Sequence, residues 1–264
     1  MNLQLDNKTA LVTGSTAGIG LAIATALAAE GARVIVNGRT PKRVSEAIEG
    51  IKQQHARAKL ESFAGDLGQA SEVDKLIQVF PELDILVNNL GIFEAKPFEE
   101  IPDEDWKRFF EVNFFSGVRL SRAYLPKMKR KNWGRIIFIS SESAVNIPVE
   151  MIHYGVTKTM QVALARGLAE TTAGTGVTVN SVLPGPTASE GVEQFVKNLA
   201  HAQKKSHEEV EKEFFEKMRP SSLIKRFART EEIASLVAYV ASPLASATNG
   251  AALRVEGGLL RSIL

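Results

Sequence analysis

The sequence predicts an α/β fold: a doubly wound, mostly seven-stranded parallel sheet with helices on both faces. Short apolar runs of β type alternate with helical patterns along the chain, which is typical of βαβ units. The first apolar run leads through a glycine-rich turn directly into a helical pattern. Distinctive polar or glycine residues follow the ends of successive strands, and in such sheets ligands gather at that rim.

Each strand is expected where a short aliphatic and β-branched run is bounded by turn residues. The expected strands are residues 8–13, 33–37, 59–64, 84–87, 135–140, 177–182 and 251–255. Helices are expected between them, at 19–29, 41–54, 71–80, 102–112, 114–131, 154–173 and 230–240. Glycine, proline and serine mark the turns, and the sequence shows no repeat or low-complexity linker. We therefore expect one domain over residues 1–264.

The segment 188–219 interrupts this βα rhythm. Its apolar residues Val210, Phe214, Phe215 and Met218 lie at helical spacing, and charged residues cover the opposite face. The pattern fits an ordinary amphipathic helix packed on the domain. It also fits a helical lid that gives a substrate pocket an apolar wall, and the two interpretations are compatible. We expect a substrate-lid insertion here.

Composition excludes several classes of protein. Apolar residues make up 44% of the 264 residues, enough for a substantial core, and the formal charge of +2 does not favour nucleic acid or a membrane surface. No cysteine is available for disulfides or thiolate chemistry. No apolar stretch reaches membrane-spanning length and no signal peptide is visible, so we expect a cytoplasmic protein. No metal site is predicted, because no ligand spacing links His55, His153, His201 and His207.

Residues 14–20, Gly-Ser-Thr-Ala-Gly-Ile-Gly, form the turn between the first strand and the first helix. Glycines let a backbone approach a pyrophosphate closely, and a helix N-terminus supplies free N–H groups and a positive dipole. The spacing is GxxxGxG, which differs from the commonest dinucleotide fingerprint. A glycine turn can be purely structural, but its place after an N-terminal strand favours nucleotide binding.

Tyr154 and Lys158 are four residues apart in an expected helix, so the ammonium should lie beside the phenol ring. A phenol has a pKa of about 10, and a nearby positive charge is expected to lower it. Ser141, thirteen residues before the tyrosine, supplies a hydroxyl that can hold a substrate oxygen. A tyrosine and a lysine that merely share a helix face are the plain alternative. Glu142 and His153 are expected to be solvated or to line a wall.

The ordered motifs are Thr13 to Gly20, Asn88-Asn89-Leu90-Gly91, Asn113, Ser141, Tyr154 with Lys158, Pro184-Gly185 and Val255-Glu256-Gly257-Gly258. Together they resemble the short-chain dehydrogenase/reductases of the Ser-Tyr-Lys type, which have a single Rossmann domain. The resemblance covers nearly the whole chain. Leu90 stands where the family usually has Ala, and Glu256 where it usually has Asp; neither change removes a catalytic group.

The resemblance implies hydride transfer between a nicotinamide and a carbonyl or secondary alcohol. Tyr154 would be the general acid/base, Lys158 would lower its pKa and hold the ribose hydroxyls, and Ser141 would bind the substrate oxygen. Asn113 would pin a water that links Lys158 to solvent. These four residues form the predicted catalytic set.

The resemblance also assigns cofactor contacts along the rim. Asp66 would bond the adenine amino group, Asn88 would brace the sheet, and Pro184 with Gly185 would contact the nicotinamide end. A helix cap is the alternative for Asp66, although it lies far from the next helix. The predicted cofactor-binding set is Gly14, Ser15, Thr16, Gly18, Ile19, Gly20, Arg39, Asp66, Leu67, Asn89, Gly91, Tyr154, Lys158, Pro184, Gly185 and Thr187.

The residues after the second expected strand favour NADP over NAD. NAD-binding enzymes of this fold carry an acidic residue there for the ribose 2′-hydroxyl. Here Gly38 offers no carboxylate, and Arg39 offers a permanently charged donor for a 2′-phosphate. A solvated surface arginine is the alternative. Ala17 stands where many NADP-preferring relatives carry a second basic residue, so a moderate preference is expected.

The substrate stays open among 3-oxoacyl thioesters, cyclic or steroid-like ketones, sugars and xenobiotic carbonyls. A 3-oxoacyl-thioester reductase is the alternative specific identity. A non-catalytic dinucleotide-sensing protein is the alternative class, but a sensor has no need of the complete catalytic set. Residues 257–264 place four large apolar side chains in a short tail. Relatives bury this segment between subunits, so we expect a homotetramer; a tail folded on its own domain is the alternative.

Overall fold

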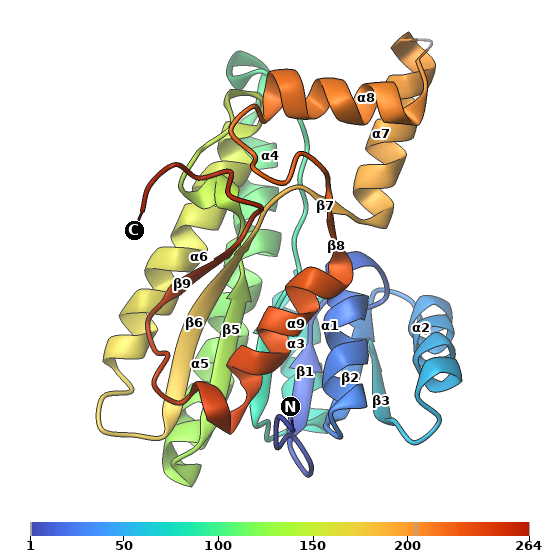
Figure 1. The fold of residues 1–264 in the computed structure, drawn as a ribbon. Helices are drawn as coiled ribbons and strands as arrows, with labels where there is room; N and C mark the ends of the chain where they lie inside the picture. Colours follow the sequence, from blue (N-terminus) through green and yellow to red (C-terminus); the bar gives the residue numbers. More distant parts are fainter. Residues whose placement is uncertain (1, 204, 264) are drawn as a thin grey trace.

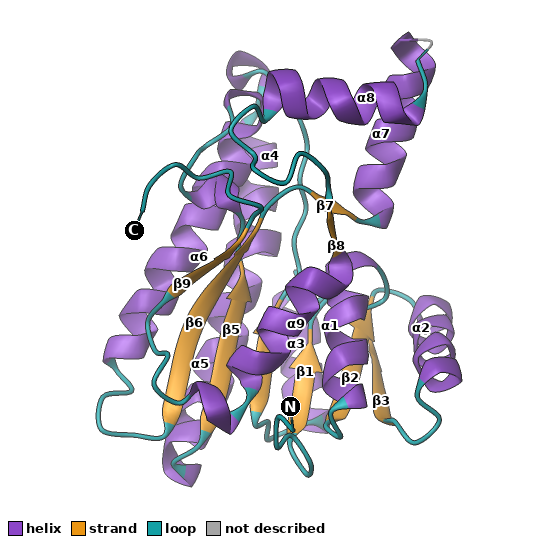
Figure 2. Ribbon diagram, in the orientation of Figure 1, coloured by secondary structure: helices purple, strands orange, loops and turns teal. Residues whose placement is uncertain are grey.

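The structure is a computed structural model that describes residues 2–203 and 205–263. Met1, Lys204 and Leu264 belong to the expected domain 1–264 but lie outside the described residues. Lys204 is also part of the expected lid segment 188–219. Seven parallel strands form one sheet in the order β3-β2-β1-β4-β5-β6-β9 (Figure 1, Figure 2). The strands are β1 (Thr9–Val12), β2 (Arg33–Gly38), β3 (Lys59–Ala64), β4 (Ile85–Asn88), β5 (Gly134–Ile139), β6 (Val177–Pro184) and β9 (Ala252–Val255).

Helices cover both faces of the sheet, as the sequence predicts. Successive strand side chains point to opposite faces, so Ala10 and Val12 of β1 enter one apolar core and Leu11 enters the other. The first core is closed by α1 (Gly18–Ala29), α2 (Pro41–Gln54) and α9 (Thr230–Ala241). The second is closed by α3 (Ala70–Val79), α5 (Ser116–Lys131) and α6 (Ile152–Glu170). The doubly wound α/β fold is confirmed.

The helical region after β4 differs from the prediction in one respect. The sequence suggests separate helices at 102–112 and 114–131. The structure instead has α4 (Asp103–Phe109) continuing through a π-helical turn, Phe110–Phe115, into α5. A π turn inserts an extra residue into a helix and is frequent at functional sites. Here it carries Asn113, which is buried.

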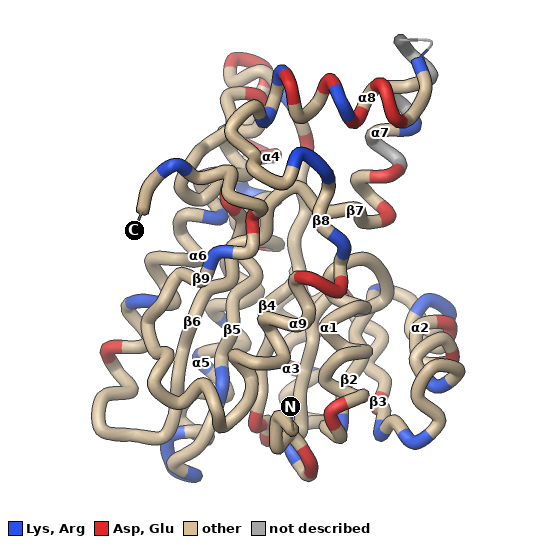
Figure 3. Tube along the Cα trace, viewed as in Figure 1, with Lys and Arg blue, Asp and Glu red and all other residues tan. Residues whose placement is uncertain are grey.

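The segment 188–219 forms two helices, where the sequence indicated one amphipathic pattern. These are α7 (Glu190–Gln203) and α8 (His207–Glu213), and a π-helical turn (Phe214–Met218) follows. Both helices lie beyond the carboxyl ends of the strands (Figure 1), and α8 is mainly acidic, with Lys212 among its glutamates (Figure 3). The segment is anchored by a small parallel pair, β7 (Thr187–Ala188) with β8 (Ala228–Arg229).

The end of the chain folds partly back on its own sheet. Leu259 and Leu260 are buried, and the Glu256 carboxylate accepts both of their N–H groups. Ile263 is 98% exposed. Within residues 2–203 and 205–263, no helix combines the length and the apolar composition needed to cross a membrane.

Candidate active site

Asn37, at the end of β2, ties the glycine turn to the sheet. Its side-chain oxygen accepts from Gly14 N–H at 3.0 Å, and its amide donates to the carbonyls of Phe63 and Gly65, each at 3.1 Å. The main-chain carbonyl of Asn37 accepts a hydrogen bond from Ser15 N–H at 2.8 Å. The sequence analysis missed this residue, although a polar side chain inside an apolar strand was a visible signal.

The predicted cofactor residues of the turn divide into two groups. The Ser15 hydroxyl donates to Val12 O at 2.7 Å and the residue is fully buried, so Ser15 builds the turn and leaves no donor for a ligand. A Cβ on Gly20 would lie 2.3 Å from Gly14 O, so only glycine allows this close approach. By contrast, Thr16, Gly18 and Ile19 keep partial exposure on the outer side of the turn.

The N-terminus of α1 can receive an anion. Ala17 precedes the helix without a side-chain cap, and the first turn holds no acidic residue. Gly14 and Gly18 have φ angles of +60° and +54°, a region that glycine adopts without strain. The first N–H groups of a helix have no partner within it and carry the positive end of its dipole. This cradle fits a phosphate group.

Arg39 follows β2 at the same rim and is exposed. A Cβ on the preceding Gly38 would lie 2.4 Å from Thr16 Cγ2, so an acidic side chain at that position would require the Thr16 side chain to move. The rim beside β2 therefore carries a cation and lacks the carboxylate that recognises a ribose 2′-hydroxyl.

A cavity of about 440 Å³ lies at the carboxyl ends of the central strands and extends to the segment 188–219. The predicted site residues that line it are Ile19, Asn89, Gly91, Ser141, Tyr154, Lys158, Pro184, Gly185 and Thr187. The other predicted residues, which do not line it, are Gly14, Ser15, Thr16, Gly18, Gly20, Arg39, Asp66, Leu67 and Asn113. Much of the remaining wall is apolar and includes Ile92, Phe93, Met151, Phe214, Met218 and Phe227.

Phe214 and Met218 reach the cavity, but Phe215 does not. Phe215 is 2% exposed and packs with Val196 and Val210 inside the segment 188–219. The predicted apolar face is thus divided. Val210 and Phe215 pack inside the segment, and Phe214 and Met218 face the cavity.

Tyr154 and Lys158 lie one turn apart on α6, as their spacing predicts. Lys158 Nζ is 5.6 Å from the centroid of the Tyr154 ring. The ammonium is buried and donates to Ile139 O at 2.9 Å and to Gln161 Oε1 at 3.3 Å. The edge of the Phe93 ring meets the tyrosine at a centroid distance of 6.4 Å. These contacts hold the phenol and the ammonium in fixed orientations in the cavity wall.

The titration of this pair differs from the prediction. Burial raises the pKa of Tyr154 to about 12, although the contact with Ser141 acts in the opposite direction. Burial also lowers the pKa of Lys158 to about 7. The net direction for Tyr154 is thus opposite to the one expected, because desolvation disfavours the phenolate, as it disfavours the ammonium of Lys158. That the charge of Lys158 lowers the phenol pKa stays a prediction. A phenol that keeps its proton at neutral pH is suited to donate it.

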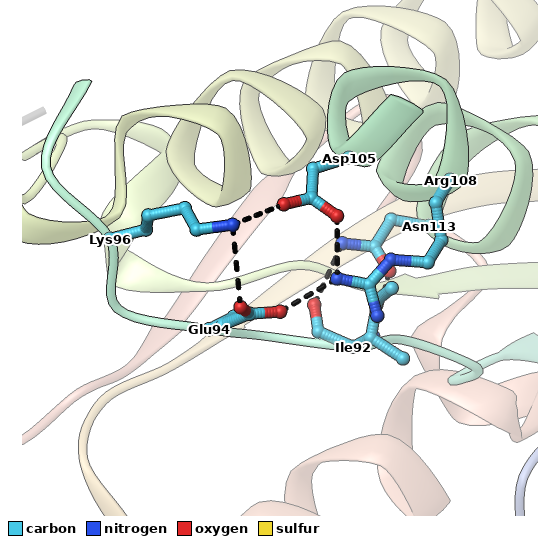
Figure 4. A network of polar contacts seen from close by, with 6 residues as sticks. All are labelled: Ile92, Glu94, Lys96, Asp105, Arg108 and Asn113. Carbon is cyan, nitrogen blue, oxygen red and sulfur yellow. Dashed lines mark hydrogen bonds and ion pairs between the residues drawn. The ribbon is translucent and has the colours of Figure 1, made fainter. Parts of the chain in front are cut away.

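Asn113 clamps the loop that follows β4. Its Oδ1 accepts from Ile92 N–H at 2.7 Å, and its Nδ2 donates to Ile92 O and Thr157 Oγ1, each at 3.0 Å. Figure 4 shows the asparagine paired with Ile92 in this way. Protein groups therefore occupy the side chain, and any contact from Asn113 to a water near Lys158 would have to use its main chain.

Four charged side chains fasten the same loop to α4 (Figure 4). Lys96 Nζ lies 2.6 Å from Asp105, and Arg108 lies 2.6 Å from Glu94 and 3.1 Å from Asp105. Single exposed ion pairs contribute little, but a closed network restricts the chain segment that joins its members. Phe93, which lines the cavity, directly precedes Glu94 in the same loop.

Gln161 connects Lys158 with Asn113. It lies one turn beyond the lysine on α6, is 2% exposed, and accepts from Lys158 Nζ through Oε1. Its Nε2 donates to the main-chain carbonyl of Asn113. A side-chain amide thus stands between the two groups that the resemblance links through water. The sequence analysis missed Gln161, although its spacing of three residues from Lys158 placed it on the same helix face.

Ser141 and Glu142 follow β5 at the cavity. The Ser141 hydroxyl accepts from Ser143 N–H at 3.1 Å and begins a short 3-10 turn (Glu142–Ala144) that holds both side chains in the wall. Glu142 is buried, not solvated, and its carboxylate faces Arg219. Burial raises the pKa of Glu142, while Arg219 acts in the opposite direction. No role for Arg219 was predicted.

His153 does not line the cavity. Its ring packs 4.0 Å from the Phe109 ring centroid and 6.0 Å from that of Trp106, and neither ring nitrogen has a partner among the described residues. Burial lowers its pKa. The histidine therefore acts as part of the core.

The remaining predicted cofactor residues lie along the rim. Asp66 is partly exposed and its Oδ1 accepts from Gly68 N–H at 3.0 Å, so it does not cap α3. Leu67 is buried in the second core, which leaves only its main chain for a ligand. Thr187 Oγ1 donates to Gly185 O at 2.9 Å.

The chain is similar to known oxidoreductases along its whole length. The family model described as short chain dehydrogenase matches residues 8–200. The uncharacterized oxidoreductase YvaG of Bacillus subtilis is 54% identical over 263 residues, which cover 100% of both chains. L-sorbose reductase from Gluconobacter frateurii, solved with NADPH and L-sorbose, has a TM-score of 0.93 at 30% identity and 100% coverage of both chains. A 7α-hydroxysteroid dehydrogenase solved with NADH has a TM-score of 0.84 at 29% identity, with coverage of 100% of this chain and 98% of that one.

Proposed function

The chain belongs to the short chain dehydrogenase family, and we propose that it is an NADP(H)-dependent oxidoreductase acting on a carbonyl or secondary alcohol. One observation carries the proposal: Ser141, Tyr154 and Lys158 line one cavity with Pro184 and Gly185 at the strand ends. The cofactor would supply or accept the hydride.

The chain's own groups fit a dinucleotide. The uncapped first turn of α1 would hold the phosphates. A Cβ on Gly91 would lie 3.4 Å from Lys158 Nζ, so the glycine keeps the approach to the ammonium open for ribose hydroxyls. Ser141 would bind the substrate oxygen, and Tyr154 would donate its proton to that oxygen in reduction or remove it in oxidation. Burial keeps the phenol of Tyr154 protonated, as a proton donor must be, but its raised pKa also makes it a weaker acid than a free phenol.

Replacing Tyr154 with Phe tests the catalytic part. Loss of a general acid/base usually costs about 100- to 10,000-fold in rate. NADPH binding should persist, because the ring remains. Tyr239→Phe, on the exposed side of α9, is the matched control and should keep full activity. Near-normal turnover in Tyr154→Phe would refute the proposed mechanism. If neither the wild-type chain nor Tyr154→Phe turned over any substrate, a dinucleotide sensor would be favoured.

Arg39 and the glycine before it support NADP as the preferred cofactor. Solved relatives hold NADPH in one case and NADH in another, so the choice depends on this chain's own residues. Arg39→Ala should weaken NADPH binding by about 2 kcal/mol, about 30-fold, and leave NADH binding nearly unchanged. Arg57→Ala, in the exposed turn before β3, is the control. Equal losses for both coenzymes would refute the preference.

The proposal also covers the extent of the domain and the assembly of the chain. We take residues 1–264 as one catalytic domain in which 188–219 serves as a substrate lid, since Phe214 and Met218 face the cavity. A homotetramer is supported by exposed apolar side chains near the tail: Val145 is 57% exposed and shares a surface hollow with Met218 and Leu260. Light scattering at micromolar concentration tests the assembly, and a monomer mass would exclude it.

A further inference from the structure

Two buried, oppositely charged side chains face each other in the cavity wall with one unpartnered atom each. Glu142 is 4% exposed and Arg219 is 8% exposed. Arg219 Nε lies 3.5 Å from Glu142 Oε1, yet it forms no hydrogen bond, and Glu142 Oε2 has no donor. Among the carboxylates, ammonium groups and guanidinium groups of the described residues, these are the two buried atoms left without a hydrogen-bond partner.

The rest of the guanidinium is held in place. Its Nη1 donates to Met218 O at 2.9 Å, and both Nη atoms lie 3.3 Å from Glu150 Oε1. The guanidinium carbon lies 5.7 Å from the centroid of the Phe214 ring. Arg219 is therefore fixed through its Nη atoms, while Nε has no hydrogen-bond partner.

The chemistry of the two free atoms selects one kind of group. A hydroxyl donates one hydrogen bond and accepts others, so it can satisfy Glu142 Oε2 and Arg219 Nε together. A substrate carboxylate would pair with Arg219 but would be repelled by Glu142 and Glu150. An ammonium could donate to Glu142 but has no acceptor for Arg219 Nε–H and would meet the charge of Arg219, and a hydrocarbon would leave both buried atoms unsatisfied.

We propose that Glu142 and Arg219 select a neutral substrate that carries a further hydroxyl close to the reacting carbon, as in a hydroxyketone, a ketose or the corresponding polyol. The inference rests on the proposed oxidoreductase function. Glu142 follows Ser141 directly in the chain, and both residues line the cavity with Tyr154. A hydroxyl bound by Glu142 would therefore lie in the same cavity of about 440 Å³ as the oxygen that Ser141 and Tyr154 would bind.

A matched set of small ketones tests the selection. Acetoin, butanone and acetoacetate share a four-carbon chain with one ketone. Relative to butanone, acetoin carries a hydroxyl on the carbon next to the carbonyl, and acetoacetate carries a carboxylate in place of the terminal methyl group. A ketohexose adds further hydroxyls. With NADPH, kcat/KM for acetoin should exceed that for butanone by about 10- to 100-fold, because an unsatisfied buried charged group has a cost of this order. Acetoin should also exceed acetoacetate. A ratio near one, or a preference for acetoacetate, would overturn the inference.

A double variant separates this pair from general effects on the fold. In Glu142→Leu/Arg219→Met both partners become apolar, which is often tolerated when a buried ion pair is replaced. The ratio of acetoin to butanone should fall toward one, with butanone turnover kept or increased. Arg33→Met/Glu61→Leu, an exposed pair between β2 and β3, is the control and should keep the original ratio. An unchanged ratio in the first double variant would refute the selection.

A binding measurement distinguishes failure of this inference from failure of the proposed function. If the chain oxidises NADPH with none of these ketones, no ratio of activities can be formed, and binding decides in its place. Ligand-detected NMR with NADP present then still compares acetoin with butanone on the wild-type chain. Tighter binding of acetoin that disappears in Glu142→Leu/Arg219→Met supports the hydroxyl site, and equal binding of both ketones overturns it.

Discussion

Gln161 Nε2 donates a hydrogen bond to the main-chain carbonyl of Asn113, and the same amide accepts from Lys158 Nζ at 3.3 Å through Oε1. The amide therefore spans the distance between the π-helical turn and the buried ammonium. Gln161 therefore holds the lysine in place, and an amide group does not pass protons as readily as water does. A proton leaving Tyr154 through Lys158 would need another way out.

Replacing Gln161 distinguishes this role from simple packing. Gln161→Leu keeps most of the volume but removes the donor to Asn113 O and the acceptor for Lys158 Nζ, so kcat for carbonyl reduction should fall about 10-fold or more. Gln161→Ala opens space beside two polar groups, where a water can bind and bridge them. Alanine should therefore retain more activity than leucine. If Gln161 only filled space, the order would be reversed, because the larger cavity would be the more damaging.

The lowered pKa of Lys158 predicts a pH dependence for NADPH binding. Its folded pKa of about 7 lies below the ordinary value of 10.5, so the ammonium loses its proton near neutrality. Charge-assisted hydrogen bonds are roughly twice as strong as neutral ones. NADPH affinity, measured by fluorescence titration, should therefore decrease as pH rises through about 7. Lys158→Met should bind more weakly and without that inflection; a flat profile in the wild-type chain would contradict the assignment.

The sequence analysis succeeded where the signal was local. Strand and helix periodicity, the glycine turn and the spacing of Tyr154 and Lys158 depend on neighbouring residues, and the structure reproduces the fold, the turn and that spacing. The pKa of Tyr154 was predicted in the wrong direction because burial is a property of the packed chain. A charge four residues away could be seen in the sequence, but the desolvation that outweighs it could not.

Contacts between distant segments account for the residues that were missed. Gln161 and Asn113 are 48 residues apart, and Arg219 and Glu150 are 69 residues apart. No periodicity links such pairs, because the fold alone brings them together. The sequence offered a local signal for Gln161, three residues after Lys158 on one helix face, and for Asn37, a polar residue within an apolar strand.

The ion-pair network beside Asn113 predicts a loss of stability in acid. The hydrogen bond from Lys96 holds the pKa of Asp105 below its usual value of 3.8. A depressed carboxyl pKa contributes stability above the unfolded value, and this contribution is lost as pH falls through the folded one. The urea midpoint of Asp105→Asn should lie below that of the wild-type chain at pH 6, and the two should converge as pH falls below 3.8. Asp103→Asn removes an acid from the same helical turn and should show no such convergence.

His153 predicts a second loss of folding stability in acid, which begins at a higher pH than the loss caused by Asp105. Burial lowers its pKa below 6.5, while the charges of Glu94 and Asp105 act in the opposite direction. The unfolded chain therefore binds a proton at pH values where the folded chain does not, so stability decreases as pH falls below 6.5 and stops decreasing below the folded pKa. His153→Phe keeps an aromatic ring against Phe109 and removes the titrating group. Its urea midpoint should change less between pH 7 and pH 5 than that of the wild-type chain. Protonation of the buried ring is unfavourable, because its nitrogens have no partner and its surroundings are aromatic. Parallel curves for the two proteins would contradict this, since they would mean that the ring is protonated without cost.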